Sequence, residues 1–159
     1  MKIAGAHTVP AAREWAFALL KDPVVLARCM PGCQALERTG DGEYHMKMKM
    51  VLASMSGLFD GRVKVADSCP PESFRLTVEG AGKIGFMKGE GVLTLAAVDG
   101  GTGVAFAGDV HVGGTLAAVG QRLIDTTSRM LIKRFFEKLG AEIAAGEAAR
   151  AAPYPGDLY

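Results

Sequence analysis

The feature that most constrains the fold is a change of hydrophobic period at Gly113-Gly114. Before it, between Cys33 and Val112, apolar and polar residues alternate in runs separated by turn residues such as TGDGE, DSCPPES and VDGGTG, a pattern typical of antiparallel strands. After it, apolar residues recur every three or four positions, which is the period of an amphipathic helix. The sequence therefore predicts an antiparallel sheet followed by one long helix from about residue 115 to 145.

The stretch HVGGTLAAVGQRLI, residues 111–124, has glycines that suggest a phosphate-binding loop. A Walker loop requires a lysine and a Ser or Thr after its last glycine, whereas Gly120 is followed by Gln121 and Arg122. The spacing does not fit a dinucleotide fingerprint either. We therefore expect Gly113 and Gly114 to allow a sharp turn from strand to helix, and Gly120 to remove a side chain where the helix crosses the sheet closely.

The N-terminal part is expected to form one strand, Lys2 to Val9, and two short helices in AAREWAFALL and DPVVLARCM. Asp22 can cap the second helix, with Pro23 at its first position. Together with the later segments, the turn signals predict about seven strands in an α+β fold. We expect one ligand-binding domain over residues 1–145, followed at 146–159 by a flexible tail or the start of a linker, since GEAARAAPYPGDLY is rich in Ala, Pro and Gly.

Composition excludes several functional classes. Lys and Arg number 18 against 17 Asp and Glu, so no basic field indicates nucleic-acid binding. Three cysteines do not fit a disulfide framework, and the pair at Cys29 and Cys33 lacks the second pair that a zinc site requires. The N-terminus lacks the features of a signal peptide, which predicts a cytoplasmic location.

Sequence motifs indicate no catalytic centre and no metal site. His7, His45 and His111 lie on expected strands, and none belongs to a triad or to a metal-binding spacing such as H-E-x-x-H. No serine lies in a G-x-S-x-G motif. We therefore predict that the chain is not an enzyme, and we expect each histidine to lie at the surface or in a wall of the fold.

The residues expected to bind a ligand are apolar. In GEYHMKMKMVL, alternation places Tyr44 and the three methionines on one face and His45 and the lysines on the other. Flexible methionines suit a wall that adapts to an apolar ligand, although the same residues also fit an ordinary core, and both interpretations stay open. The predicted ligand-binding residues are Met46, Met48, Met50, Val63, Phe74, Leu76, Phe86, Met87, Leu93, Phe106, Leu116, Val119, Leu123, Thr127 and Met130.

We expect the glycine-rich segment AGKIGFMKGEG to form a loop, which leaves two alternatives for Ile84, Phe86 and Met87. In the first, these side chains gate the mouth of a cleft or touch a membrane, with the polar head of a ligand near Phe86. In the second, they tuck under the sheet.

Several segments together resemble the G-subunit family of carbon monoxide dehydrogenase, over residues 1 to about 145. They are KIAGAHTVP, DPVVLARCMPGC, the F-x-G-x-V-x-V strand at Phe59, and VGGTLAAVGQRLID with its following helix. The resemblance implies a helix-grip fold, in which a curved antiparallel sheet wraps around a long C-terminal helix and fold relatives hold apolar ligands between the two. It also implies an accessory protein of aerobic carbon monoxide dehydrogenase or a related molybdenum hydroxylase, associated with the membrane.

The hypothesis that follows is a non-enzymatic carrier of an isoprenoid quinone, similar to menaquinone, peripheral to the inner face of the cell membrane. It would move this lipid between the membrane and the dehydrogenase. One alternative is a membrane recruitment or maturation factor that acts without a lipid ligand. A polyketide cyclase-like enzyme is a further alternative, because the superfamily includes such enzymes.

Overall fold

The computed structural model describes residues 1–52 and 54–151. These residues form seven strands, two short α-helices after the first strand, a 3-10 helix and a long C-terminal α-helix. In chain order the elements are β1 (Lys2–Val9), α1 (Arg13–Leu19), α2 (Pro23–Cys29), β2 (Cys33–Gly40), β3 (Glu43–Leu52), β4 (Met55–Cys69), β5 (Ser73–Gly82), β6 (Gly85–Val98), β7 (Gly101–Gly113), η1 (Gly114–Val119) and α3 (Gln121–Ala151).

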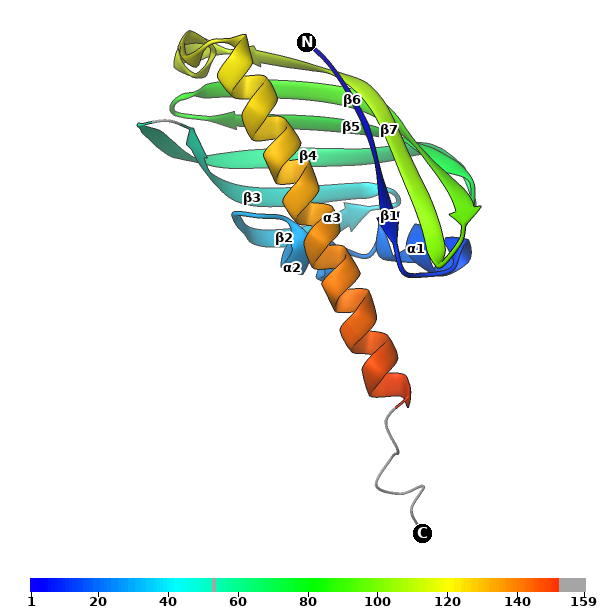
Figure 1. Ribbon diagram of the computed structural model, residues 1–159. Coiled ribbons are helices and arrows are strands. Elements are labelled where there is room, and N and C mark those ends of the chain that lie inside the picture. Colours follow the sequence, from blue (N-terminus) through cyan, green and yellow to red (C-terminus); the bar gives the residue numbers. More distant parts are fainter. Residues whose placement is uncertain (53, 152–159) are drawn as a thin grey trace.

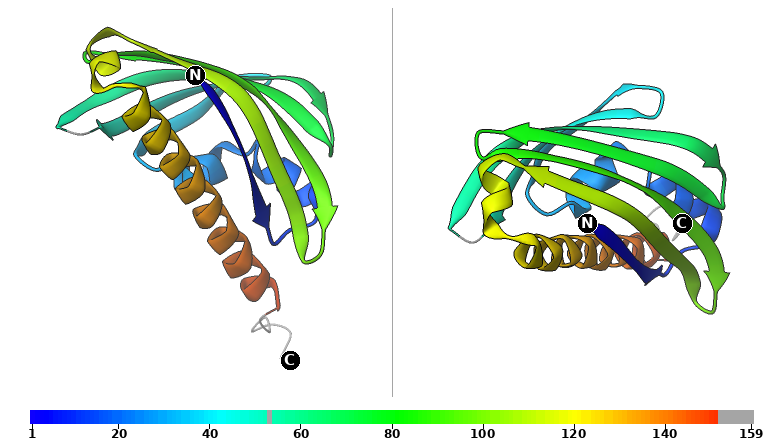
Figure 2. Two further views of the ribbon diagram at one scale, coloured as in Figure 1. Left: turned by 45° about the horizontal axis from the view of Figure 1, so that its top comes forward. Right: turned by 90° about the horizontal axis from the view of Figure 1, so that it is seen from above.

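All seven strands form one antiparallel sheet in the order β1-β7-β6-β5-β4-β3-β2. The sheet is strongly curved, and α3 runs diagonally across its inner side (Figure 1). Seen from above, the sheet arches over the helix (Figure 2). The predicted α+β class and helix-grip arrangement are confirmed.

The two short helices close one end of the sheet. The Asp22 side chain accepts a hydrogen bond of 2.9 Å from the Val24 amide, and Pro23 begins α2, as the sequence predicts. Ala16 and Phe17 of α1 are buried in the core. At this end Thr102 is fully buried, and its hydroxyl donates a 2.6 Å hydrogen bond to the Ala11 carbonyl, which ties β7 to the start of α1.

The helix predicted from about residue 115 begins later, because the chain first forms the 3-10 helix η1 and breaks at Gly120. Gly120 has a φ of +91° and nothing within 4 Å of the position that a Cβ would occupy. Its predicted role as a point of close helix–sheet crossing is therefore wrong, and its role is backbone conformation. Of the two glycines predicted to form the sharp turn, Gly114 does so at φ +74°. The prediction is wrong for Gly113, which is extended and lies under the Phe86 ring.

The helix also ends later than predicted, since α3 continues to Ala151. The remainder of the predicted tail, residues 152–159, lies outside the described residues. The segment 81–91, predicted as a glycine-rich loop, instead forms the ends of β5 and β6 and the tight turn between them.

Buried side chains gather in two separate clusters at opposite ends of the inner face. The larger cluster joins α1, α2 and the C-terminal half of α3, where Phe135, Phe136 and Leu139 are buried, to the sheet. The smaller cluster is built around Leu52, Phe59 and Leu116, and so joins β3 and β4 to η1. Between these clusters lies a stretch of inner face that belongs to neither.

Candidate functional site

Alternation along the strands sets which side chains face α3. On β3, Tyr44 and Met46 are buried and Met48 and Met50 are half-buried, whereas Lys47 and Lys49 are exposed on the outer face. This confirms the predicted orientation of the methionines. The cross-strand register then fixes the inner-face neighbours of these residues on the other strands.

The predicted ligand-binding residues fall into four groups. Phe74, Leu76, Leu93 and Phe106 belong to the larger cluster, where they meet the C-terminal half of α3. Met50, Leu116, Val119 and Leu123 belong to the smaller cluster. Met46, Met48, Val63, Met87 and Thr127 are at least half-buried and belong to neither cluster. Phe86 and Met130 do not face the inner stretch.

Phe86 and Met130 do not lie on the inner face, where the sequence predicts them. Phe86 is 53% exposed and lies over Gly113 on the outer face, because its neighbour Met87 takes the inward position on β6. Met130 is 39% exposed, because the inward positions of this turn of α3 are held by its neighbours, including Leu131. Phe86 thus lies away from the inner face, where the other predicted ligand-binding residues gather.

Five inward positions between the clusters are glycines that the register brings together in a diagonal band across the sheet. Gly61 pairs with Gly80, Gly91 pairs with Gly108, and Gly89 lies between these pairs on β6. We call Gly61, Gly80, Gly89, Gly91 and Gly108 the glycine floor. At Gly108 an added Cβ would collide with the Glu90 carbonyl, so this glycine allows close approach of the strands.

At the centre of the glycine floor, an added Cβ would make only ordinary contacts. A Cβ on Gly80 would meet only Met87 at 3.4 Å and the Asp60 carbonyl at 3.9 Å. A Cβ on Gly89 would meet only Asp109 at 3.6 Å and Val110 at 3.8 Å, again on neighbouring strands. Among the described residues, no atom of α3 comes within 4 Å of either position. These glycines therefore do not serve a close crossing of helix and sheet.

The side chains around the floor are apolar and only partly buried. On the sheet, Gly89 pairs with Val78 on one side and Val110 on the other, and Val78 pairs in turn with Val63. All three valines are half-buried. On α3, helical spacing places the short, half-buried side chains of Thr127 and Ser128 between the residues that join the smaller cluster and those that join the larger one. The half-buried side chains distinguish this stretch from the two buried clusters.

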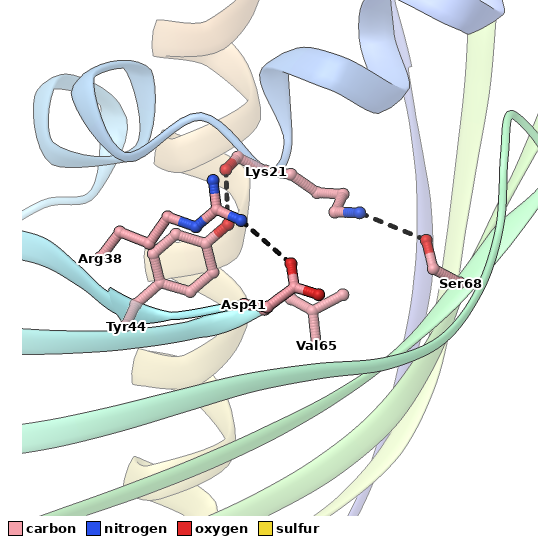
Figure 3. A pocket seen from close by; sticks show the side chains of 7 residues that line it. Lys21, Arg38, Asp41, Tyr44, Val65 and Ser68 are labelled. Atoms are coloured by element: carbon pink, nitrogen blue, oxygen red, sulfur yellow. Dashed lines mark hydrogen bonds and ion pairs between the residues drawn. The ribbon is translucent and has the colours of Figure 1, made fainter.

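A separate hollow of about 270 Å³ lies where the α1–α2 linker meets β2, β3 and β4. Its lining residues are Lys21, Arg38, Asp41, Gly42, Tyr44, Val65 and Ser68, whose side chains come from four segments of the chain (Figure 3). Gly42, at φ +66°, forms the β2–β3 turn and lies against the Val65 carbonyl, which fixes the turn beside β4.

Polar contacts around this hollow define its chemistry. The Tyr44 hydroxyl donates to the Lys21 carbonyl at 2.7 Å, and the Lys21 ammonium lies 3.3 Å from the Ser68 hydroxyl. Arg38 donates to the Asp41 carboxylate at 3.0 Å (Figure 3). The hollow thus offers two cations and one carboxylate. Sequence reasoning missed it, because these residues lie far apart along the chain and only Asp41-Gly42 carries a local signal, that of a turn.

The histidines lie where the sequence predicts, in a wall or at the surface. His7 stacks on Phe136 with ring centroids 4.7 Å apart, and His45 lies 3.7 Å from Asp60 on the outer face. His111 is exposed. Within residues 1–52 and 54–151, no group of three His, Cys, Asp or Glu side chains is placed to hold a metal ion. In the same part of the chain, no helix is both long and apolar enough to span a bilayer.

Comparisons with known proteins show which family and which solved structures this chain resembles. The family profile of the carbon monoxide dehydrogenase G subunit (CoxG) matches residues 5–144. A conserved protein from Geobacillus kaustophilus is 33% identical, with a TM-score of 0.86, over 91% of this chain and 96% of the other. A comparison with curated proteins found no match.

More distant solved structures share the fold. The Zhui aromatase/cyclase from Streptomyces sp. R1128 has a TM-score of 0.68 at 12% identity, over 96% of this chain and 99% of its own. Protein Ms6760 from Mycobacterium smegmatis has a TM-score of 0.65 at 16% identity, over 91% of this chain and 92% of its own. At these identities the likeness concerns the fold alone.

Proposed function

Because the chain belongs to the CoxG family of carbon monoxide dehydrogenase, we propose that it carries an isoprenoid quinone, similar to menaquinone, between the cell membrane and a carbon monoxide dehydrogenase-type enzyme. In this role it is a non-enzymatic accessory protein at the cytoplasmic face of the membrane. The observation that carries the proposal is the glycine floor, an apolar stretch of inner face where Gly80 and Gly89 have room for an added Cβ.

An isoprenoid tail suits this stretch physically. Its surroundings are valine and methionine side chains and short helix residues, without a charged group among the inward positions of the floor. Burying about 500 Å² of such a tail yields roughly 12 kcal/mol at about 25 cal/mol per Å². Lost translational and conformational freedom offsets several kcal/mol of this gain. The remainder is sufficient for micromolar binding or better.

A carrier also solves a transport problem. A water-soluble dehydrogenase that reduces a quinone must reach an acceptor whose tail is insoluble in water. A protein that covers the tail and presents the head group delivers this acceptor in soluble form.

One end of the molecule is suited to contact with the membrane. The end of β3, the start of β4 and the β5–β6 turn lie at the same end of the sheet as η1 (Figure 1). Here Val51, Leu58 and Phe86 are 63%, 60% and 53% exposed. Segments 49–58 and 81–88 contain lysines but no acidic residue. We call these two segments the hairpin end. Exposed apolar side chains among lysines favour the surface of an anionic bilayer.

The test is to purify the wild type, Met48→Glu and Lys47→Glu from a quinone-producing host and to quantify the co-purified lipid by mass spectrometry. Met48 faces inward beside the floor, so a charge there is expected to abolish retention of the tail. Lys47 precedes it on the outer face, so Lys47→Glu is the matched control and is expected to retain lipid. Equal lipid in all three proteins, or none in any, would favour the recruitment factor instead.

Two other functions remain as alternatives. A recruitment or maturation factor without a lipid ligand is supported by the larger cluster, which fills one end of the inner face with side chains. A cyclase-like activity is suggested by the fold of the Streptomyces aromatase/cyclase. It would require a reactive polar pair at the floor, and the inward positions of the floor itself are glycines.

A further inference from the structure

The hollow at the β2–β3 turn is too small and too polar for an isoprenoid tail. Its volume of about 270 Å³ lies below the range of about 300 to 1,000 Å³ that is typical of pockets for whole ligands. Lys21, Arg38, Asp41 and Ser68 place polar atoms around it. It therefore suits a compact head group better than a whole lipid.

The hollow adjoins one end of a row of inward side chains that leads to the glycine floor. Tyr44, which lines the hollow, pairs with Val63, Val63 pairs with Val78, and Val78 pairs with Gly89. All are inward positions of one row across the sheet. Tyr44, which is 4% exposed and whose hydroxyl donates to the Lys21 carbonyl, lies between the hollow and the rest of the row. A molecule with its head in the hollow can lay its tail along this row when the Tyr44 side chain turns aside.

The polar groups of the hollow can bind both redox forms of a quinone. The carbonyl oxygens of a quinone accept hydrogen bonds, for which Arg38 and Lys21 are donors. The hydroxyls of the reduced form donate, for which the Asp41 carboxylate is an acceptor. The Arg38–Asp41 pair does not prevent this, because both side chains are largely exposed, and an exposed pair contributes only about 0 to 1 kcal/mol.

We propose that the hollow holds the head of the carried lipid, with Arg38 and Lys21 binding the quinone carbonyls and Asp41 binding the hydroxyls of the reduced form. The inference rests on the proposed function and adds the head-group site. A carrier that delivers the oxidised form and returns the reduced form needs affinity for both. The hollow provides affinity for both forms, because it contains two hydrogen-bond donors and one acceptor.

The test uses the full chain stripped of lipid, with three probes: a naphthoquinone with a two-unit prenyl tail, its hydroquinone, and a prenyl hydrocarbon of the same tail length without a head. Arg38→Met is expected to weaken quinone binding roughly tenfold, the value of one hydrogen bond to a charged group. Asp41→Asn is expected to weaken hydroquinone binding more than quinone binding. Neither substitution is expected to change binding of the hydrocarbon.

Arg62→Met is the matched control, because Arg62 is exposed on the outer face of β4. Melting temperatures establish that each variant is folded, and if Arg38→Met does not fold, Lys21→Met replaces it. If the wild type binds the quinone but both substitutions in the hollow leave all three affinities unchanged, the head lies elsewhere and the inference is overturned. If the wild type binds none of the probes, the proposed function itself fails.

Discussion

Replacing Gly89 by valine is expected to separate ligand binding from folding. A Cβ at this position would make only ordinary contacts, at 3.6 and 3.8 Å, with residues of the neighbouring strand. Gly89 is not among the glycines with positive φ, so valine can adopt the backbone conformation. A glycine within a strand costs roughly 0.5 to 1 kcal/mol relative to alanine. Gly89→Val should therefore raise the stability of the lipid-free protein by about that amount, or about 1 to 4 °C in melting temperature.

The same substitution should remove bound lipid, because the branched side chain occupies the space above the floor. The assay combines thermal melting of stripped protein with mass spectrometry of co-purified lipid. Gly103→Val is the matched control, since Gly103 lies on the outer face and a Cβ there would meet Val98 at 3.4 Å. If Gly89→Val keeps the full amount of lipid, or if its melting temperature falls well below that of the wild type, the glycine floor is not a binding surface.

Three further predictions concern other parts of the chain. Gly120→Ala and Gly120→Leu should destabilise the folded protein equally, by about 1 to 3 kcal/mol in thermal melts, because the cost comes from the φ of +91° and not from side-chain size. A much larger loss of stability for leucine would restore the interpretation of Gly120 as a point of close crossing. Burial raises the pKa of the Cys29 thiol above its ordinary value of 9.0. The stability that this shift gives the folded state is therefore complete below that pH and is lost as the pH rises through the folded-state pKa. Thermal melts from about pH 8 to about pH 11 should show a smaller fall in melting temperature for Cys29→Ala than for the wild type. The double variant Leu58→Ser, Phe86→Ser should reduce co-sedimentation with phosphatidylglycerol vesicles several-fold. The control Val98→Ser changes an exposed apolar residue at the opposite end of the sheet and should not reduce it. Equal co-sedimentation of all variants would exclude the hairpin end as the contact surface.

Sequence periodicity was sufficient for the order of elements and for the orientation of side chains on β3. Local rules also identified the Asp22 cap, since the interacting atoms are two residues apart. They did not locate the break at Gly120, because a glycine in an apolar helical pattern fits either a close crossing or a positive φ. Which role it has depends on what lies near it in three dimensions.

The candidate site was predicted only in part, for a related reason. Alternation identifies inward residues but not which part of the helix they meet, so Phe74 and Phe106 were expected in the ligand site and lie in the larger cluster. The glycine floor depends on the register of four strands, and the hollow on side chains from four segments, neither of which is fixed by local pattern. Phe86 was misplaced because its segment was assigned to a loop, where alternation does not apply.

The most direct test of the carrier proposal is organic extraction of the wild-type protein, purified without detergent from a host that makes menaquinone, followed by quantitative mass spectrometry. The carrier proposal predicts an isoprenoid quinone in a molar ratio approaching one per folded chain, enriched over its share of the host's membrane lipids. Extracts that contain no quinone, or that contain lipids only in the proportions of the host membrane, would contradict it.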